Sequence, residues 1–433
     1  MTLPSSYRSP RLASVILVVF VDLLGFSLIL PLLPYYAEAY GAGAALIGLL
    51  VATYAAAQFV GAPILGRLSD RLGRRPVLLA SIAGTVVGFL LMALAPALGT
   101  ALADRLGLAS ASGPILAILF VSRLVDGLTG GNISVAQAYI ADITDEENRA
   151  RGLGLIGAAF GLGFIIGPAV GGSLATFGYA VPAYAAALLA TINLIMVFLF
   201  LPESLNAERR AELEARPRAS FSFSALREAL RRPRLGPLLH VRLFFGLGFA
   251  MFQTIFVLFA QARLGLGIQT TGFILTYVGV LAVAVQGGGI PALTQRVDEG
   301  RLIIVNLGIM AISFFAWALT PSLAALVIIV TPLAISGGIL NTIINSAISK
   351  AVGRDEVGGT LGLSAALESL SRIIAPIVGA WLLQDVGAWA PGIVCGILLA
   401  WTTTFALRRI SSRPVGPTAV GAAEARPATE PAA

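Results

Sequence analysis

The stretch GRLSDRLGRRPVLL, residues 66–79, puts four arginines and one aspartate between two long apolar runs. The chain of 433 residues is 57% hydrophobic and 12% charged, and its mean hydropathy is +0.89. A water-soluble protein of this size does not carry so apolar a composition, so we expect the chain to lie in a lipid bilayer. The quoted stretch is then a charged loop at the membrane surface, between two spanning helices.

About twelve runs along the chain reach the roughly 20 mainly apolar residues that a spanning helix needs, with Gly and Pro tolerated inside them. The runs, called spans 1 to 12 below, begin near Val15, Ala45, Val77, Pro114, Gly152, Pro182, Leu235, Thr271, Leu302, Leu323, Gly359 and Gly392. The sequence therefore predicts an all-α integral membrane protein with twelve transmembrane helices.

Most of the 29 lysines and arginines fall on one side of the membrane if the spans alternate in direction. They gather before span 1, in the quoted loop, between spans 6 and 7, and after span 12. Because cytoplasmic loops are enriched in Lys and Arg, we expect a multi-pass protein of the cell membrane with both termini in the cytoplasm. This placement explains the net charge of +7 without nucleic acid as a partner.

The chain divides at a charged segment that contains proline, residues 202–234. We expect this segment to be a cytoplasmic linker between two six-helix bundles, residues 1–201 and 235–410, followed by a disordered cytoplasmic tail, 411–433. The bundles look like repeats, because IIGPAVGG at 165–172 aligns with IIAPIVGA at 373–380. Two pseudo-symmetric repeats around a midplane site are the architecture by which transporters alternate access.

Four segments carry a resemblance to a known family. They are DLLGFSLILPLLPYY at 22–36, APILGRLSDRLGRRPVLL at 62–79, SRLVDGLTGGNISVAQAYIAD at 122–142 and FGLGFIIGPAVGG at 160–172. In this order, and over nearly the whole chain, they resemble the drug/proton antiporter branch of the major facilitator superfamily, especially its tetracycline-exporter-like members. The resemblance implies a proton-coupled antiporter that exports small amphipathic organic compounds. It is weaker for tetracycline itself, because classical tetracycline exporters carry an acid in span 9 and a histidine in span 8, and this chain has neither there.

In the quoted loop, Gly66 and Gly73 allow a tight turn, and anionic lipid headgroups hold the arginines. Asp70 is informative, because an anchor for anionic lipids gains nothing from a carboxylate. We expect Asp70 to cap a neighbouring helix and to pair with Arg74 or with an arginine after span 4. The resemblance implies that Gly66, Asp70, Arg71, Gly73 and Arg74 form a cytoplasmic gate between the halves. The alternative is a charge cluster that only sets topology.

Span 5 is rich in glycine. Its pattern consists of Gly157, Gly161, Gly167, Pro168, Gly171 and Gly172. Small residues let helices approach closely and proline removes a backbone hydrogen bond, so we expect span 5 to kink and to pack tightly against a partner in the other half. The resembling family associates this pattern with exporters rather than importers. The alternative is ordinary packing between small residues.

Five charged residues lie inside spans, namely Asp22, Arg123, Asp126, Glu368 and Arg372. Each costs about 2.5–3.5 kcal/mol at a helix centre, so we expect pairing. Arg123 and Asp126 are three residues apart, and the other pair is four apart, so both can pair along one helix. Asp22 has no partner in its own span and is our first choice for a proton-coupling site, with Arg123 and Asp126 near it. The alternatives are a fixed ion pair, or a proton carried by Asp126 or Glu368.

Other residues inside the spans are candidates for a substrate cavity. They are Asn132, Gln137, Gln253, Phe256, Asn341 and Asn345, with Glu368 and Arg372. No metal-ligand spacing, nucleotide-binding loop or nucleophile–base arrangement is present, so we expect neither enzyme activity, nor a cofactor, nor a metal site. We expect a monomer whose partners are a small organic substrate, protons and the bilayer. The alternatives are a proton-coupled symporter that imports sugars or organic acids, and a membrane receptor that transports nothing.

Overall fold

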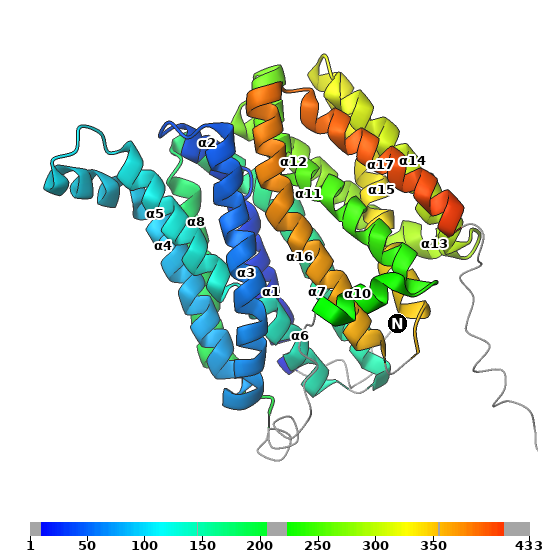
Figure 1. Cartoon of the computed structure of the whole chain (residues 1–433). Helices are drawn as coiled ribbons and strands as arrows, with labels where there is room; N and C mark the ends of the chain where they lie inside the picture. Colours follow the sequence, from blue (N-terminus) through cyan, green and yellow to red (C-terminus); the bar gives the residue numbers. More distant parts are fainter. Residues whose placement is uncertain (1–9, 145, 206–222, 354–355, 411–433) are drawn as a thin grey trace, which may run out of the picture.

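A computed structural model describes residues 10–144, 146–205, 223–353 and 356–410, and every regular element in these residues is a helix (Figure 1). We call residues 10–205 the first half and residues 223–410 the second half. The predicted disordered tail and most of the predicted linker lie outside the described residues, so both stay predictions.

The first half contains spans 1 to 6. Its helices are α1 (Pro10–Ile29), α2 (Leu32–Glu38), α3 (Ala44–Leu72), α4 (Arg74–Leu106), α5 (Ser112–Thr129), α6 (Asn132–Ile143), α7 (Glu146–Leu174), the 3₁₀ turn η2 (Ala175–Phe177) and α8 (Val181–Phe200).

The second half contains the remaining spans and one short helix before them. Its helices are α10 (Phe223–Arg231), α11 (Leu235–Leu264), α12 (Ile268–Ala284), the π turn η3 (Val285–Gly289), α13 (Ile290–Thr294), α14 (Glu299–Ala318), α15 (Leu323–Lys350), α16 (Val357–Trp381), the π turn η5 (Leu382–Val386) and α17 (Ala390–Arg409).

Eleven helical segments of the described chain are long and apolar enough to cross a membrane, which confirms the all-α membrane class. The predicted span near Thr271 is the exception, because α12 is a shorter apolar helix. The chain continues from α12 through the π turn η3, whose sequence is VQGGG, into the five residues of α13. Glycines give a helix little intrinsic stability, and π turns interrupt the regular hydrogen-bond ladder. The expected count of twelve is therefore confirmed for eleven spans.

Two predicted spans are each broken into two helices. Span 1 breaks at Pro31 between α1 and α2, and span 4 breaks at Gly130 and Gly131 between α5 and α6. Gly131 lies close to α3, because a Cβ atom added to it would be 2.8 Å from Cδ1 of Leu65. The second break starts α6 at Asn132, a residue of the candidate site.

The two halves are joined at one end of the bundle, which we call the α2 side; the opposite end, at Gly73 and α10, is the linker side. The Tyr35 hydroxyl donates to the carbonyl of Leu266 at 2.8 Å, and Gln261 donates to Glu38 at 2.6 Å. The backbone N–H of Ala45 donates to Gln384 at 2.9 Å. Hydrogen bonds between described residues of the two halves thus cluster on the α2 side.

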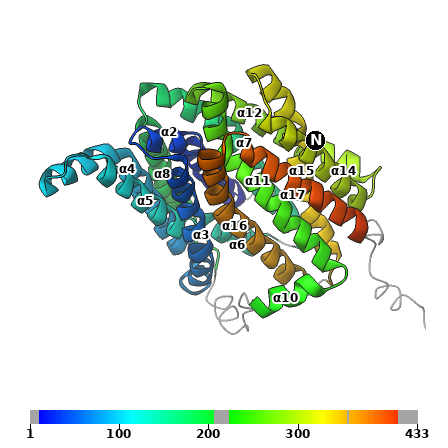
Figure 2. The same cartoon turned by 45° about the horizontal axis from the view of Figure 1, so that its top comes forward.

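Glycines on this side let the helices of the two halves touch. A Cβ atom added to Gly172 of α7 would lie 2.9 Å from the carbonyl oxygen of Ile268, and one added to Gly48 of α3 would clash with Pro376 of α16. On the linker side, added Cβ atoms at Gly157 of α7 and Gly362 of α16 would meet nothing within 4 Å. Figures 1 and 2 show α3 and α16 close together near α2 and diverging towards α10. The structure is therefore closed on the α2 side and open on the linker side.

The glycines of span 5 do not act as one surface, which corrects part of the expectation. Gly161 and Gly172 face α12 in the other half, whereas Gly167 faces Ser27 of α1 and Gly171 faces Leu28 of α1, in the same half. Gly157 faces open space. The spacing that brings Gly161 to α12 turns Gly167 by about 240° around the helix, because each residue advances the helix by about 100°.

A leucine at Gly172 tests the closure of the α2 side. Since its Cβ would meet the backbone of α12, Gly172→Leu should push the halves apart there, whereas Gly157→Leu, on the same helix, should not. Spin labels at Leu46 of α3 and Val386 of η5 measure the separation, and the native Cys395 is buried and does not interfere. Longer distances in the first variant alone support the assignment. Equal distributions in both variants, at normal yield, contradict it.

Candidate functional site

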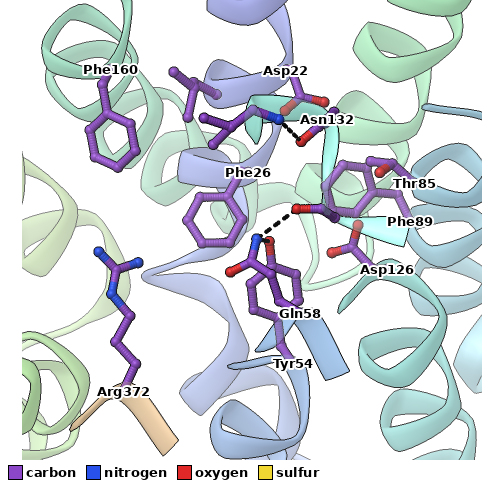
Figure 3. Close-up of a pocket in the computed structure, with 13 residues that line it drawn as sticks. Asp22, Phe26, Tyr54, Gln58, Thr85, Phe89, Asp126, Asn132, Phe160 and Arg372 are labelled. Carbon is purple, nitrogen blue, oxygen red and sulfur yellow. Dashed lines mark hydrogen bonds between the residues drawn. The ribbon is translucent and has the colours of Figure 1, made fainter. Parts of the chain in front are cut away.

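A pocket between the two halves brings together charged residues from distant parts of the chain. It has about 530 Å³ of unfilled space, part of it open to solvent. Its lining consists of Asp22, Leu23, Phe26, Tyr54, Gln58, Thr85, Phe89, Asp126, Gly130, Asn132, Ile133, Phe160 and Arg372 (Figure 3). Of the predicted site residues, Asp22, Asp126, Asn132 and Arg372 meet here, from α1, α5, α6 and α16.

Asp22 lies in this pocket without a cationic neighbour. Among the described residues, no lysine or arginine nitrogen is within 4.0 Å of its carboxylate. The side chain of Asn132 lies beside it, and Asp126 lines the same pocket (Figure 3). Two acids of the first half therefore share this pocket.

Arg123 pairs with Asp126, as the spacing predicted. Its Nη1 lies 3.1 Å from Oδ2 of Asp126, and both side chains are almost fully buried. The guanidinium also lies over the rings of Tyr54, at 5.9 Å, and Phe89, at 5.7 Å, a cation–π arrangement. Arg123 does not line the pocket. The guanidinium expected near Asp22 is thus held by Asp126 and two aromatic rings.

The break between α5 and α6 is held by a polar network that the sequence analysis did not assign. Gln58 of α3 donates to the carbonyl of Gly130 at 2.8 Å and to the hydroxyl of Tyr54 at 3.1 Å. Tyr54 thus links this network to Arg123. The spacing of four residues between Tyr54 and Gln58 could have predicted their contact, because such residues lie on the same face of a helix.

The second half contributes its own charge cluster. Glu368 of α16 accepts from Arg372 at 2.7 Å, which confirms the predicted pair. It also forms an ion pair with Arg242 of α11, which donates in addition to Asn341 at 2.7 Å. Asn345 nearby accepts from Ser364 at 3.1 Å. Asn341 and Asn345 therefore hold other polar side chains in place.

Arg242 is a charged residue inside a span that was not among the five predicted from the sequence. It lies within α11, about two turns from the first residue Leu235, and is 2% exposed. Its position seven residues into an apolar run was the available signal. The charges inside the spans therefore include one more arginine than expected.

Six of the eight predicted cavity residues are not part of the pocket lining: Asn341, Asn345 and Glu368, which belong to the cluster above, and Phe256, Gln137 and Gln253. Phe256 is fully buried in the hydrophobic core and packs against Phe252, with ring centroids 5.3 Å apart. This corrects its assignment, because Phe252, one turn earlier on α11, packs against Phe314 and Trp317 of α14. Gln137 of α6 and Gln253 of α11 are exposed, and neither lines the pocket.

The stretch at residues 66–79, expected as a loop, is the end of α3, Gly73 and the start of α4, and it forms a charged cluster within the first half. Arg74, nearly buried, donates to Asp70 at 2.7 Å, to Ser69 at 2.7 Å and to Asp142 of α6 at 2.9 Å. Gly73 has a φ of +108°, a backbone conformation that side chains other than glycine rarely adopt. The cluster joins α3, α4 and α6.

The start of α4 is capped by a carboxylate that the sequence did not predict. The carboxylate of Glu203, just after α8, accepts from the backbone N–H groups of Arg74 at 2.9 Å and Arg75 at 3.1 Å. Asp70 is on the preceding helix and pairs with the Arg74 side chain instead, as the spacing of four residues allows. Glu203 is far away in sequence, so local spacing gave no signal for it.

Removal of the Glu203 charge should loosen the linker side of the first half. Glu203→Gln weakens a charge-assisted cap and should lower stability by about 1 kcal/mol. Asp104→Asn, at the opposite end of α4 where the carboxylate is exposed, is the matched control and should not lower it. Thermal unfolding of the purified protein compares the two. Equal melting temperatures for wild type and Glu203→Gln would exclude the cap as a stabilising contact.

Comparisons with known proteins agree with this architecture. The family model described as Major Facilitator Superfamily matches residues 15–376. The class C tetracycline resistance protein of Escherichia coli is 34% identical over 83% of this chain and 86% of that protein. Multidrug resistance protein 2 of Bacillus subtilis (strain 168) is 26% identical over 88% of this chain and 90% of that protein.

A solved structure shares the fold. The human organic anion transporter MFSD10 (TETRAN) is 23% identical, with a TM-score of 0.65, over 93% of this chain and 100% of that chain.

Proposed function

Because this chain belongs to the Major Facilitator Superfamily and to its drug-efflux branch, we propose that it is a proton-coupled antiporter of the cell membrane. It exports small amphipathic organic compounds by alternating access. The observation that carries the proposal is an acid, Asp22, in a pocket between the halves with no arginine or lysine nitrogen within 4.0 Å among the described residues.

Asp22 has the chemistry of a proton carrier. A charged carboxylate inside a membrane protein is costly unless it is paired, and protonation removes that charge. Asp126 already has Arg123 as a fixed partner at 3.1 Å. Asp22, which has no such partner among the described residues, is therefore the acid that binds and releases a proton during the cycle.

The lining of the pocket suits an amphipathic compound. Phe26 and Phe160 offer apolar ring faces, while Asn132 and Gln58 offer amide groups. Ligand sites commonly combine an apolar lining with a few polar groups that fix orientation. The relatives named for resistance to tetracycline and to multiple drugs support compounds of this size and character as substrates.

In this proposal, transport runs outward and the open linker side is where substrate is loaded. By the positive-inside rule the linker side is cytoplasmic, so the structure corresponds to the state that loads substrate from the cytoplasm. Binding of substrate releases the proton from Asp22 to the cytoplasm, and closure of the linker side with opening of the α2 side releases the substrate outside. Asp22 then binds a proton there, which allows the return.

Asp22→Asn tests the coupling. In proteoliposomes with an imposed pH gradient, the variant should lose uphill transport and keep downhill exchange, because Asn cannot bind and release a proton. Asp104→Asn, which is exposed and far from the pocket, should behave like wild type. Uphill transport that survives in Asp22→Asn would refute the assignment. Movement of substrate and protons in the same direction would refute antiport itself.

A further inference from the structure

The two sides of the pocket carry opposite charges. The side of the first half has two acids, Asp22 and Asp126, and one arginine, Arg123, which pairs with Asp126. On the side of the second half, Arg242 and Arg372 share one acid, Glu368. If all six groups are ionised, the first-half side has an excess negative charge and the second-half side an excess positive charge.

Arg372 is the cation that reaches the pocket. Its side chain is 48% exposed, against 3% for Arg242, although it lies in the middle of the spanning helix α16. Figure 3 shows its guanidinium pointing into the pocket from α16, across from the acids of the first half. A charged group at this depth is stable only next to water or an anion, so the exposed face of Arg372 belongs to the pocket.

Arg242 affects how many N–H donors of Arg372 remain available to a ligand. It is buried and binds one oxygen of Glu368, Oε2, while Arg372 binds the other, Oε1. Arg372 uses only its Nη2 in that bond, and no other hydrogen bond to it is found among the described residues. A guanidinium has five N–H donors in a planar fork that matches a carboxylate, sulfonate or phosphate group. The donors of Arg372 on the pocket side are therefore available to an anion.

Aromatic rings complete this part of the pocket. Phe160 and Phe26, both lining residues, lie on the side from which Arg372 enters (Figure 3). Phe160 stacks on Phe164 at 4.7 Å, which fixes its ring. An arginine next to apolar ring faces is a site for an anionic group attached to an aromatic body.

We propose that Arg372 binds an acidic group of the transported compound, so that the exported substrates are amphipathic organic anions. This inference rests on the proposed function, because it takes the pocket to be the substrate site. Glu368, held by Arg242, keeps the guanidinium of Arg372 oriented towards the pocket. Arg372 therefore determines charge selectivity, whereas Asp22 carries the proton.

The test uses two probes that differ mainly in charge. Naphthalene-2-sulfonate stays ionised and does not cross the bilayer as a neutral acid, and naphthalene-2-sulfonamide is its neutral counterpart. Equilibrium dialysis with the full-length protein in lipid nanodiscs measures the affinity of each. Wild type should bind the sulfonate about tenfold more tightly or better, as expected for one charge-assisted contact.

Variants of Arg372 identify the group responsible. Arg372→Gln should remove the preference and leave the sulfonamide affinity unchanged, while Arg372→Lys should keep part of it, since a lysine retains the charge but not the planar fork. Arg301→Gln, on the exposed first turn of α14, removes a positive charge far from the pocket and should keep the full preference. Size-exclusion profiles and melting temperatures check that each variant is folded.

The outcomes separate this inference from the proposed function. Equal binding of the two probes by wild type, no binding of the sulfonate, or a preference that persists in Arg372→Gln overturns the anion site. Uphill transport of the sulfonamide that depends on Asp22 would then leave the antiporter proposal intact. A sulfonate preference that depends on Arg372, without transport driven by a pH gradient, supports the anion site and contradicts proton coupling.

Discussion

The constraint on which the rest of this structure depends is the cost of placing charge inside a membrane. Each of the six charged residues found at this depth is either paired or faces the pocket. Arg123 pairs with Asp126, and Arg242 and Arg372 pair with Glu368. Asp22 faces the pocket without an ion pair, since no cation lies within 4.0 Å of it in the described structure. An unpaired acid inside a membrane protein marks a functional site, where a proton or a ligand neutralises its charge.

The polar clusters also connect neighbouring helices within each half. At the glycine break, Gln58 donates to the carbonyl of Gly130 and to the Tyr54 hydroxyl, and the Tyr54 ring lies against the Arg123 guanidinium. In the second half, Arg242 spans from α11 to α16 and fixes Glu368. Asp126 of the first cluster and Arg372 of the second line the same pocket, and the hydrogen bonds between the halves are concentrated on the α2 side. Movement of one half relative to the other can therefore change access without breaking either cluster.

The sequence allowed the predictions that depend on local spacing. The apolar runs predicted eleven of the spans, and spacings of three and four residues predicted the pairs Arg123–Asp126 and Glu368–Arg372. The interpretations that failed depend on contacts between distant segments. Phe256 faces the core, Gly167 faces its own half, and Glu203 caps a helix that begins 129 residues earlier. Periodicity places a residue on a face of a helix, but it does not say which neighbour covers that face.

The central claim is that Asp22 exchanges a proton for substrate, and proton release on binding tests it most directly. The purified protein is placed in a weakly buffered solution with a pH-sensitive dye, and whichever naphthalene compound it binds is added. The account predicts release of about one proton per bound ligand from wild type and none from Asp22→Asn that still binds the compound. No release from wild type, or equal release from the variant, would contradict it.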